Sequence, residues 1–173
     1  MTPYSIDIAR QRFSFWAACR AAQAGSAKAR RSQLISALKE CGVVAWIAEP
    51  ANHSVDLQTY DAQFNCWVIS VQRHLKEQHR KAVMYGVAAK LVSTYLKSVF
   101  VLTGSERTPL AAHITPPIDS VLLKKVDAAH KTKLSARFKW QKLTQQEYRG
   151  VVRELRRVNG SAPLWHLERY WEL

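Results

Sequence analysis

Apolar residues recur at intervals of three and four positions along most of this chain. The clearest example lies in the middle of the sequence, at Leu91, Val92, Tyr95, Leu96, Val99 and Phe100. Such spacing places side chains on one face of an α-helix, whereas a half-buried strand would alternate apolar and polar residues. Few segments alternate in that way. The sequence therefore predicts an all-α fold, a compact multi-helix bundle.

Capping signals mark several helix ends. Thr144 and Glu147 form a T-x-x-E capping box, Gly160 follows the same helix, and Ser161 with Pro163 opens the last one. The stretch Gly104–Pro117 is predicted to be a polar loop, long enough to have a functional role. The predicted helices span Ser5–Ala22, Arg30–Cys41, Val43–Ala48, Leu57–Glu77, His79–Leu102, Ile118–Ala129, Gln145–Val158 and Pro163–Trp171.

Length and composition favour a single domain over residues 1–173, without a linker or tail. A chain of this length buries about 70% of the surface that it exposes when unfolded, so its core needs no disulfide or metal. Cys19, Cys41 and Cys66 form no C-x-x-C pair, which argues against a disulfide framework, a zinc site or an iron–sulfur cluster. We expect three buried thiols and no cofactor.

The strongest compositional signal is charge: 26 Lys and Arg against 13 Asp and Glu, a net charge of +13. A first basic block (Ile8–Lys39) contains no acid, and a second basic block (Ser120–Lys142) contains only Asp127. A basic surface of this kind usually binds a polyanion, and nucleic acid is the leading partner. The blocks lack the apolar face of a membrane-surface helix, and we expect neither a leader nor a membrane-spanning segment. We expect a cytoplasmic monomer; a basic surface without function is the alternative.

Two short segments carry a more specific signal. Met84-Tyr-Gly-Val-Ala-Ala-Lys90 contains a G-x-x-x-K spacing from Gly86 to Lys90, and Thr115-Pro-Pro-Ile-Asp119-Ser-Val opens a later helix. Their order resembles the active-site region of the helix-hairpin-helix DNA glycosylases, where such a Lys precedes a P-V-D-T-H-V-type segment with the catalytic Asp. Ser120 stands at the Thr place and Val121 at the His place. The small prokaryotic 8-oxoguanine glycosylases, and antiviral glycosylases that excise modified phage bases, are the most similar branches.

A carboxylate and a lysine amine are suited to glycosidic bond cleavage on chemical grounds alone. Cleavage of an N-glycosidic bond builds positive charge on the sugar, which a carboxylate such as Asp119 can stabilise. A neutral Lys90 amine could attack C1′ and form a Schiff base, or Lys90 could help by its charge alone. Two structural alternatives stay open: Asp119 as a helix N-cap only, and Lys90 as a solvated or phosphate-binding side chain.

The resemblance implies an enzyme that flips a damaged or modified base out of double-stranded DNA and excises it, with strand cleavage as an associated activity. The base would be 8-oxoguanine or a modified phage base such as glucosylated hydroxymethylcytosine. Catalysis is assigned to Asp119 and Lys90, and the base pocket to Tyr60, Phe64, Trp67 and Trp140. DNA contacts are assigned to Gly86, Lys97, Lys124, Lys125, Arg30, Arg31 and His113.

Two other functions remain open. The chain could be a non-catalytic nucleic-acid-binding protein or a component of a defence system, whose helices dock by charge. It could also be an interaction module whose basic face binds an acidic protein. Most of the aromatic residues, including Phe13, Trp16 and the terminal group Trp165, Tyr170 and Trp171, are assigned to the core.

Overall fold

The computed structural model describes residues 4–24 and 27–170. Within these ranges the chain forms helices joined by short connections, without a strand, so the predicted all-α class is confirmed. The α-helices are α1 (Ile6–Ala24), α2 (Arg31–Glu40), α3 (Val43–Ala48), α4 (Leu57–His79), α5 (Tyr85–Val99), α6 (Pro109–His113), α7 (Ser120–His130), α8 (Leu134–Arg137) and α9 (Gln145–Asn159). The 3₁₀-helices are η1 (Pro50–Ser54), η2 (Val101–Thr103), η3 (Trp140–Lys142) and η4 (Leu164–Tyr170).

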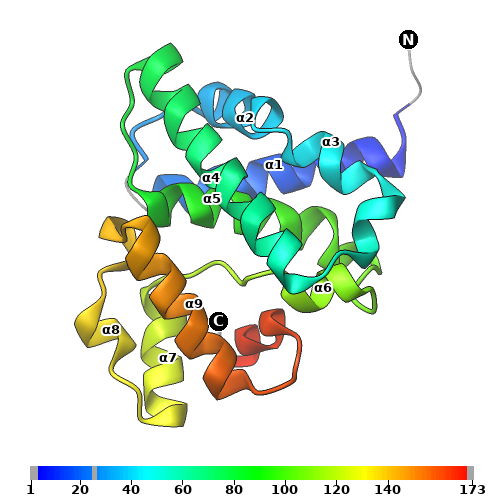
Figure 1. Cartoon of the computed structure of the whole chain (residues 1–173). Helices are drawn as coiled ribbons and strands as arrows, with labels where there is room; N and C mark the ends of the chain where they lie inside the picture. The colour runs from blue at the N-terminus through cyan, green and yellow to red at the C-terminus, as the bar shows by residue number, and fades with distance from the viewer. Residues whose placement is uncertain (1–3, 25–26, 171–173) are drawn as a thin grey trace.

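Helix α5 is the centre of the bundle. Most of its residues are buried, and it contacts α1, α4, α9 and η3. In Figure 1, α1 to α4 lie on one side of α5, while α7, α8, α9 and the C-terminal segment lie on the other. The window Tyr85–Thr103 is long and apolar enough to span a membrane by length and composition, a window that the sequence analysis missed, but 78% of it is buried inside the protein. It is therefore packed as the core helix of a bundle.

The connection between α4 and α5 differs from the prediction. The sequence predicts a helix from His79, but α4 continues through His79 and ends at Arg80, which adopts a left-handed conformation (φ 52°). Residues 81–84 are non-helical, and the Gln72 side chain donates a hydrogen bond to the Val83 carbonyl (2.8 Å). Helix α5 then begins at Tyr85. The sequence predicts a break at Gln78, but the break lies at residues 80–84, because Arg80 takes the left-handed position that glycine usually fills.

Three further predictions need correction. The stretch Gly104–Pro117 contains α6, which Thr108 caps by accepting a hydrogen bond from the Ala111 N–H (3.3 Å). The C-terminal segment is the 3₁₀-helix η4 rather than an α-helix, and the predicted end at Trp171 lies outside the described residues. Of the three thiols predicted to be buried, Cys19 is buried, Cys41 is half-buried and Cys66 is exposed. Burial raises the pKa of both Cys19 and Cys41 to about 11.

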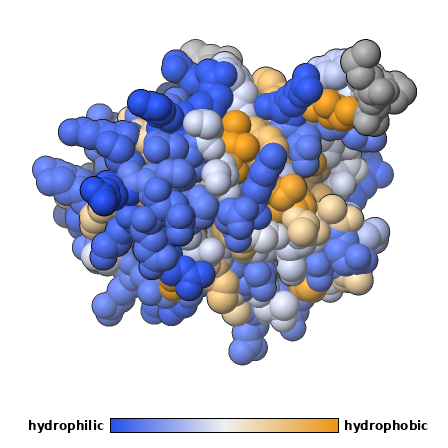
Figure 2. All heavy atoms as spheres, turned by 90° about the horizontal axis from the view of Figure 1, so that it is seen from above, coloured by the Kyte–Doolittle hydropathy of each residue, from blue (hydrophilic) through white to orange (hydrophobic). Residues whose placement is uncertain are grey.

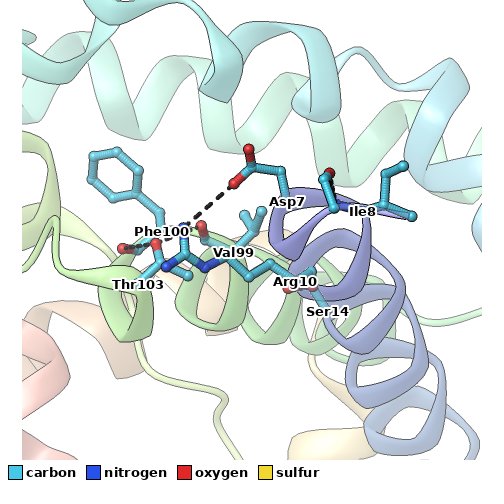
Figure 3. Close-up of polar contacts among 8 residues, drawn as sticks. Asp7, Ile8, Arg10, Ser14, Val99, Phe100 and Thr103 are labelled. Carbon is cyan, nitrogen blue, oxygen red and sulfur yellow. Dashed lines mark hydrogen bonds and ion pairs between the residues drawn. The ribbon is translucent and has the colours of Figure 1, made fainter. Parts of the chain in front are cut away.

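The first turns of α1 lie against the C-terminal end of α5 (Figure 3). There the Thr103 hydroxyl donates to the carbonyls of Val99 (2.9 Å) and Phe100 (3.0 Å), and so satisfies backbone groups at the end of the helix. On α1, Arg10 forms an exposed ion pair with Asp7 (3.4 Å). Both sets of contacts are local: one satisfies the end of α5, and the other pairs two side chains within α1.

The surface is largely hydrophilic, with hydrophobic residues in small groups on the face drawn in Figure 2. Two aromatic residues of α1 that were predicted to be in the core are exposed: Phe13 (57%) and Trp16 (46%). Their rings lie 5.7 Å apart. Phe15, between them in sequence, points inward and stacks on Tyr95 at 5.2 Å.

A single carboxylate ties α8 to the end of α7. Asp127 accepts hydrogen bonds from the backbone N–H groups of Leu134 (2.7 Å) and Ser135 (2.9 Å), and from the hydroxyls of Thr132 and Ser135. Burial alone would raise the pKa of Asp127, but the hydrogen bonds from Ser135 and Thr132 outweigh it and lower the pKa. The ionised carboxylate therefore holds the loop between α7 and α8.

Replacing Asp127 by Ala removes all four acceptor contacts, so we expect a loss of about 1–3 kcal/mol in the free energy of unfolding. Because the folded-state pKa is lowered, the stabilisation is present above the unfolded pKa of about 3.9 and disappears as the pH falls through the folded value. Urea unfolding of the unmodified protein and of Asp127→Ala, at pH 7 and at pH 3, measures this loss in the free energy of unfolding and its dependence on pH. The exposed Asp7→Ala should change stability by less than about 0.5 kcal/mol. If D127A lost the same free energy of unfolding at both pH values, the stabilising role of the ionised Asp127 carboxylate would be contradicted.

Candidate functional site

Lys90 and Asp119, which the sequence analysis pairs, are in direct contact. The Lys90 Nζ lies 3.1 Å from Asp119 Oδ2. It also lies 4.4 Å from the centre of the Trp140 ring. Lys90 is 8% exposed, so its charge is removed from most of the solvent and is balanced by a carboxylate and an aromatic face. Three segments far apart in the sequence therefore meet around one amine.

Asp119 is held from both sides. It is the N-cap of α7, where its Oδ1 accepts a hydrogen bond from the Leu122 N–H (2.9 Å), while Oδ2 accepts from Lys90. The preceding residues Pro116 and Ile118 are buried and anchor the segment that enters α7. Asp119 is therefore a helix N-cap through Oδ1 and an ion-pair partner of Lys90 through Oδ2.

Gly86 makes this arrangement possible. It lies in the first turn of α5, and a Cβ atom there would stand 2.0 Å from the Trp140 carbonyl oxygen and 3.1 Å from Leu143 Cβ. Its N–H donates to the Leu143 carbonyl (3.1 Å). Only glycine permits so close an approach of two backbones. The approach brings Trp140 onto the helix that carries Lys90.

The ion pair opens into a cavity of about 420 Å³, here called the lysine cavity. One wall is the face of α1 that carries Ala17, Ala21 and Ala24, whose small side chains leave room. Exposed Trp16 and Arg20 lie on the same face. The remaining lining residues are Lys90, Thr94 and Lys97 on α5, Pro117, Asp119 and Leu122 at the start of α7, and Glu168 in η4.

A second ion pair lies in the same cavity. Lys97, two turns beyond Lys90 on α5, pairs with Glu168, and both side chains are about four-fifths buried. Burial raises the pKa of Glu168, against the opposing charge of Lys97, and the charge of Asp119 adds to the rise. The cavity thus holds one carboxylate fixed by a helix N-terminus and a second one that burial disfavours in its charged form.

The residues predicted for the base pocket are dispersed. Trp140 lies beneath Lys90, but Tyr60 and Trp67 are fully buried in the core. The Tyr60 hydroxyl accepts a hydrogen bond from the Thr115 N–H (3.4 Å), and Trp67 packs edge-on against Trp46 (5.0 Å). Phe64 lines a different cavity. None of the four aromatic residues therefore lines the lysine cavity; Trp140 contacts the Lys90 amine but lines a different pocket.

The residues predicted to bind DNA also fall into several places. Gly86 is buried and its N–H is taken by Leu143, so that N–H is not available to a phosphate. Lys97 lines the lysine cavity, and His113 lies at the end of α6 near Tyr60, where burial lowers its pKa. The remaining four are exposed: Arg30 and Arg31 at the start of α2, and Lys124 and Lys125 on α7.

Sequence reasoning missed Trp16, Arg20 and Glu168 as lining residues. Glu168 is the one acid in η4, and the regular spacing of Ala17, Ala21 and Ala24 on α1 marks a helix face with little bulk. Neither signal identifies a cavity before the packing of α1 and η4 against α5 is known. Comparison with protein-family models, with curated proteins and with solved structures finds no match.

Gly86→Ala tests the close approach of α5 and η3. The new methyl group must displace the Trp140 carbonyl, so we expect a loss of about 1–3 kcal/mol or more in the free energy of unfolding. Gly150→Ala is the matched control, because it also lies within a helix and a Cβ there meets nothing within 4 Å. That variant should be neutral or more stable by up to about 1 kcal/mol. Chemical denaturation compares the two; equal stabilities would contradict the role assigned to Gly86.

Proposed function

We propose that the protein is a DNA glycosylase that excises a damaged or modified base in the lysine cavity. The observation that carries the proposal is the contact between Lys90 and Asp119 at 3.1 Å inside a cavity of about 420 Å³ on a chain of net charge +13. Ligand cavities typically measure about 300–1,000 Å³, so a single extruded base fits. The resemblance of the G-x-x-x-K and P-P-I-D segments to the helix-hairpin-helix glycosylases supports the same function.

In this mechanism the flipped nucleotide enters past Trp16, whose exposed ring offers a stacking surface. The bond between C1′ and the base breaks, its electron pair leaves with the base, and the base takes up a proton. Asp119 Oδ2 faces the positive charge that develops on the sugar and stabilises it. Water then adds to C1′ and releases a proton, which leaves an abasic site.

The distribution of charge around the cavity agrees with this use. Arg20 of the first basic block lies on one wall, and the opposite wall is the start of α7, which continues into the second basic block. In Figure 1, α1 and α7 lie on opposite sides of α5. A duplex laid across the cavity would meet basic side chains on both sides, and salt would weaken its binding steeply.

Asp119→Asn separates chemistry from capping, since Asn caps helices as well as Asp does. We expect the variant to lose at least about 100-fold in excision rate. The measurement uses duplexes with 8-oxoguanine, uracil, an alkylated base or glucosylated hydroxymethylcytosine, followed by alkali to cleave abasic sites. At least one should be cleaved after treatment with the unmodified protein.

Asp56→Asn is the matched control, because Asp56 caps α4 through the Thr59 N–H (2.7 Å) in the same way, away from the cavity. The double variant Lys90→Met with Asp119→Asn avoids a buried unpaired cation and checks that inactivity does not reflect unfolding. No abasic sites on any duplex, or full activity in D119N, would contradict the glycosylase. DNA binding without turnover would instead support the non-catalytic DNA-binding function, in which Asp119 is an N-cap and ion-pair partner only.

Borohydride trapping tests the role of Lys90. The Asp119 carboxylate and the Trp140 ring contact the Lys90 amine, and both attract a cation. We therefore propose that Lys90 assists the reaction through its positive charge and does not attack C1′ as a nucleophile. We expect abasic product without a covalent protein–DNA adduct when borohydride is present. An adduct that disappears in Lys90→Met would contradict this role and assign to Lys90 a Schiff base and strand cleavage.

A further inference from the structure

A second cavity, here called the arginine cavity, lies between α4, α5 and α9. Its volume is about 370 Å³, and it shares no lining residue with the lysine cavity. The segment before α7 separates the two, since Thr115 lines the arginine cavity while Pro117 and Asp119 line the lysine cavity. The mechanism proposed above uses none of its residues.

Arginines of α9 give this cavity its charge. Arg149, Arg153 and Arg156 follow one another at helical spacing and all line it, against the single carboxylate of Asp61. Arg156 is satisfied by Asp61 through two hydrogen bonds of 2.8 and 2.7 Å. Arg149 and Arg153 are exposed and have no hydrogen bond or ion pair to any residue that the structure describes. Two guanidinium groups are therefore available to an anion.

The inner walls of the cavity are aromatic. Tyr148 lies 5.3 Å from Tyr85 and stacks on Phe64 at 5.9 Å, measured between ring centres. Burial raises the pKa of Tyr85 to about 12, and the charge of Arg149, which lines the same cavity, opposes that rise. Aromatic walls beside arginines suit a ligand that is planar at one end and anionic at the other.

A fixed polar group completes the lining. Asn65 Oδ1 accepts hydrogen bonds from the Tyr85 hydroxyl (3.1 Å) and from Gln145 Nε2 (2.6 Å). Both contacts fix the orientation of the amide, so its N–H groups, which have no partner in residues 4–24 and 27–170, remain free to donate. Ring nitrogens and carbonyl oxygens of a nucleobase are acceptors for such a donor.

We propose that the arginine cavity binds a nucleoside phosphate, with the phosphate at Arg149 and Arg153 and the base against Tyr85 and Tyr148. Paired arginines recognise phosphate by bidentate hydrogen bonds. The ligand is a free nucleotide or the terminal nucleotide of a DNA strand, which share this chemistry. The site does not depend on the proposed glycosylase, because none of its residues takes part in that reaction.

Binding is measured with the full chain and a fluorescent 2′-deoxyadenosine 5′-monophosphate, by anisotropy at low salt. Arg149→Gln with Arg153→Gln should weaken binding by about tenfold or more, since each guanidinium contributes a charge-assisted hydrogen bond. Arg73→Gln with Arg107→Gln is the matched control: it removes the same charge from exposed arginines that line neither cavity. Ala62→Trp, at an exposed lining position of α4, should block the cavity without changing charge.

Competition distinguishes the source of the ligand. Inorganic phosphate should compete at least about tenfold more weakly than the nucleotide, because it lacks the base. A 5′-phosphorylated oligonucleotide that competes better than the mononucleotide, and only when Arg149 and Arg153 are present, identifies a strand end as the ligand; equal competition identifies the free nucleotide. Unchanged binding in the arginine or Ala62 variants, an equal loss in the control, or equal competition by phosphate would overturn the proposal. Asp119→Asn should leave nucleotide binding unchanged.

Discussion

The need to balance one buried positive charge organises the centre of this protein. Lys90 lies on the most buried helix of the bundle, and its amine is removed from most of the solvent. An isolated charge in such a place is costly, so it requires an opposite charge or an aromatic face. Asp119 and Trp140 supply these from two later segments. These two contacts with Lys90 attach the part of the chain after α6 to helix α5.

Much of the fold can be predicted because helix formation is largely local. The three- and four-residue spacing of apolar side chains predicts the main helices, and the capping box of Thr144 and Glu147 is present as predicted. A break between α4 and α5 is predicted, but its position and length could not be, since Arg80 takes a left-handed conformation without glycine. The short helix α6 does carry a local signal, Thr108 followed by Pro109, which the assignment of a polar loop overlooked.

The candidate site was predictable only in part. The motif resemblance pairs Lys90 with Asp119, and the structure brings them together. Glu168 and Trp16 could not be assigned to the same cavity, because that depends on how α1 and η4 pack on α5, which is a tertiary property. For the same reason Tyr60 and Trp67 were assigned to a pocket, although their rings fill the core. Residue type identifies aromatic side chains, but packing decides which of them face a ligand.

The two cavities differ in the chemistry they offer. The lysine cavity contains two ion pairs, in which Lys90 and Lys97 are each opposed by a carboxylate. It can therefore interact with a charge that develops during a reaction. The arginine cavity has guanidinium groups in excess and aromatic walls, which suits binding of a stable anion. We infer that catalysis and nucleotide binding occupy different sides of the segment that enters α7.

The most direct test of the central claim compares two duplexes that contain abasic-site analogues. One has a neutral tetrahydrofuran, and the other has a pyrrolidine whose ammonium mimics the positive charge of the transition state. If Asp119 stabilises that charge, the protein should bind the pyrrolidine duplex at least about 100-fold more tightly, as is typical of transition-state analogues. The preference should disappear in Asp119→Asn. Equal affinity for both duplexes in the unmodified protein would contradict the assignment of Asp119 and Lys90 to glycosidic bond cleavage.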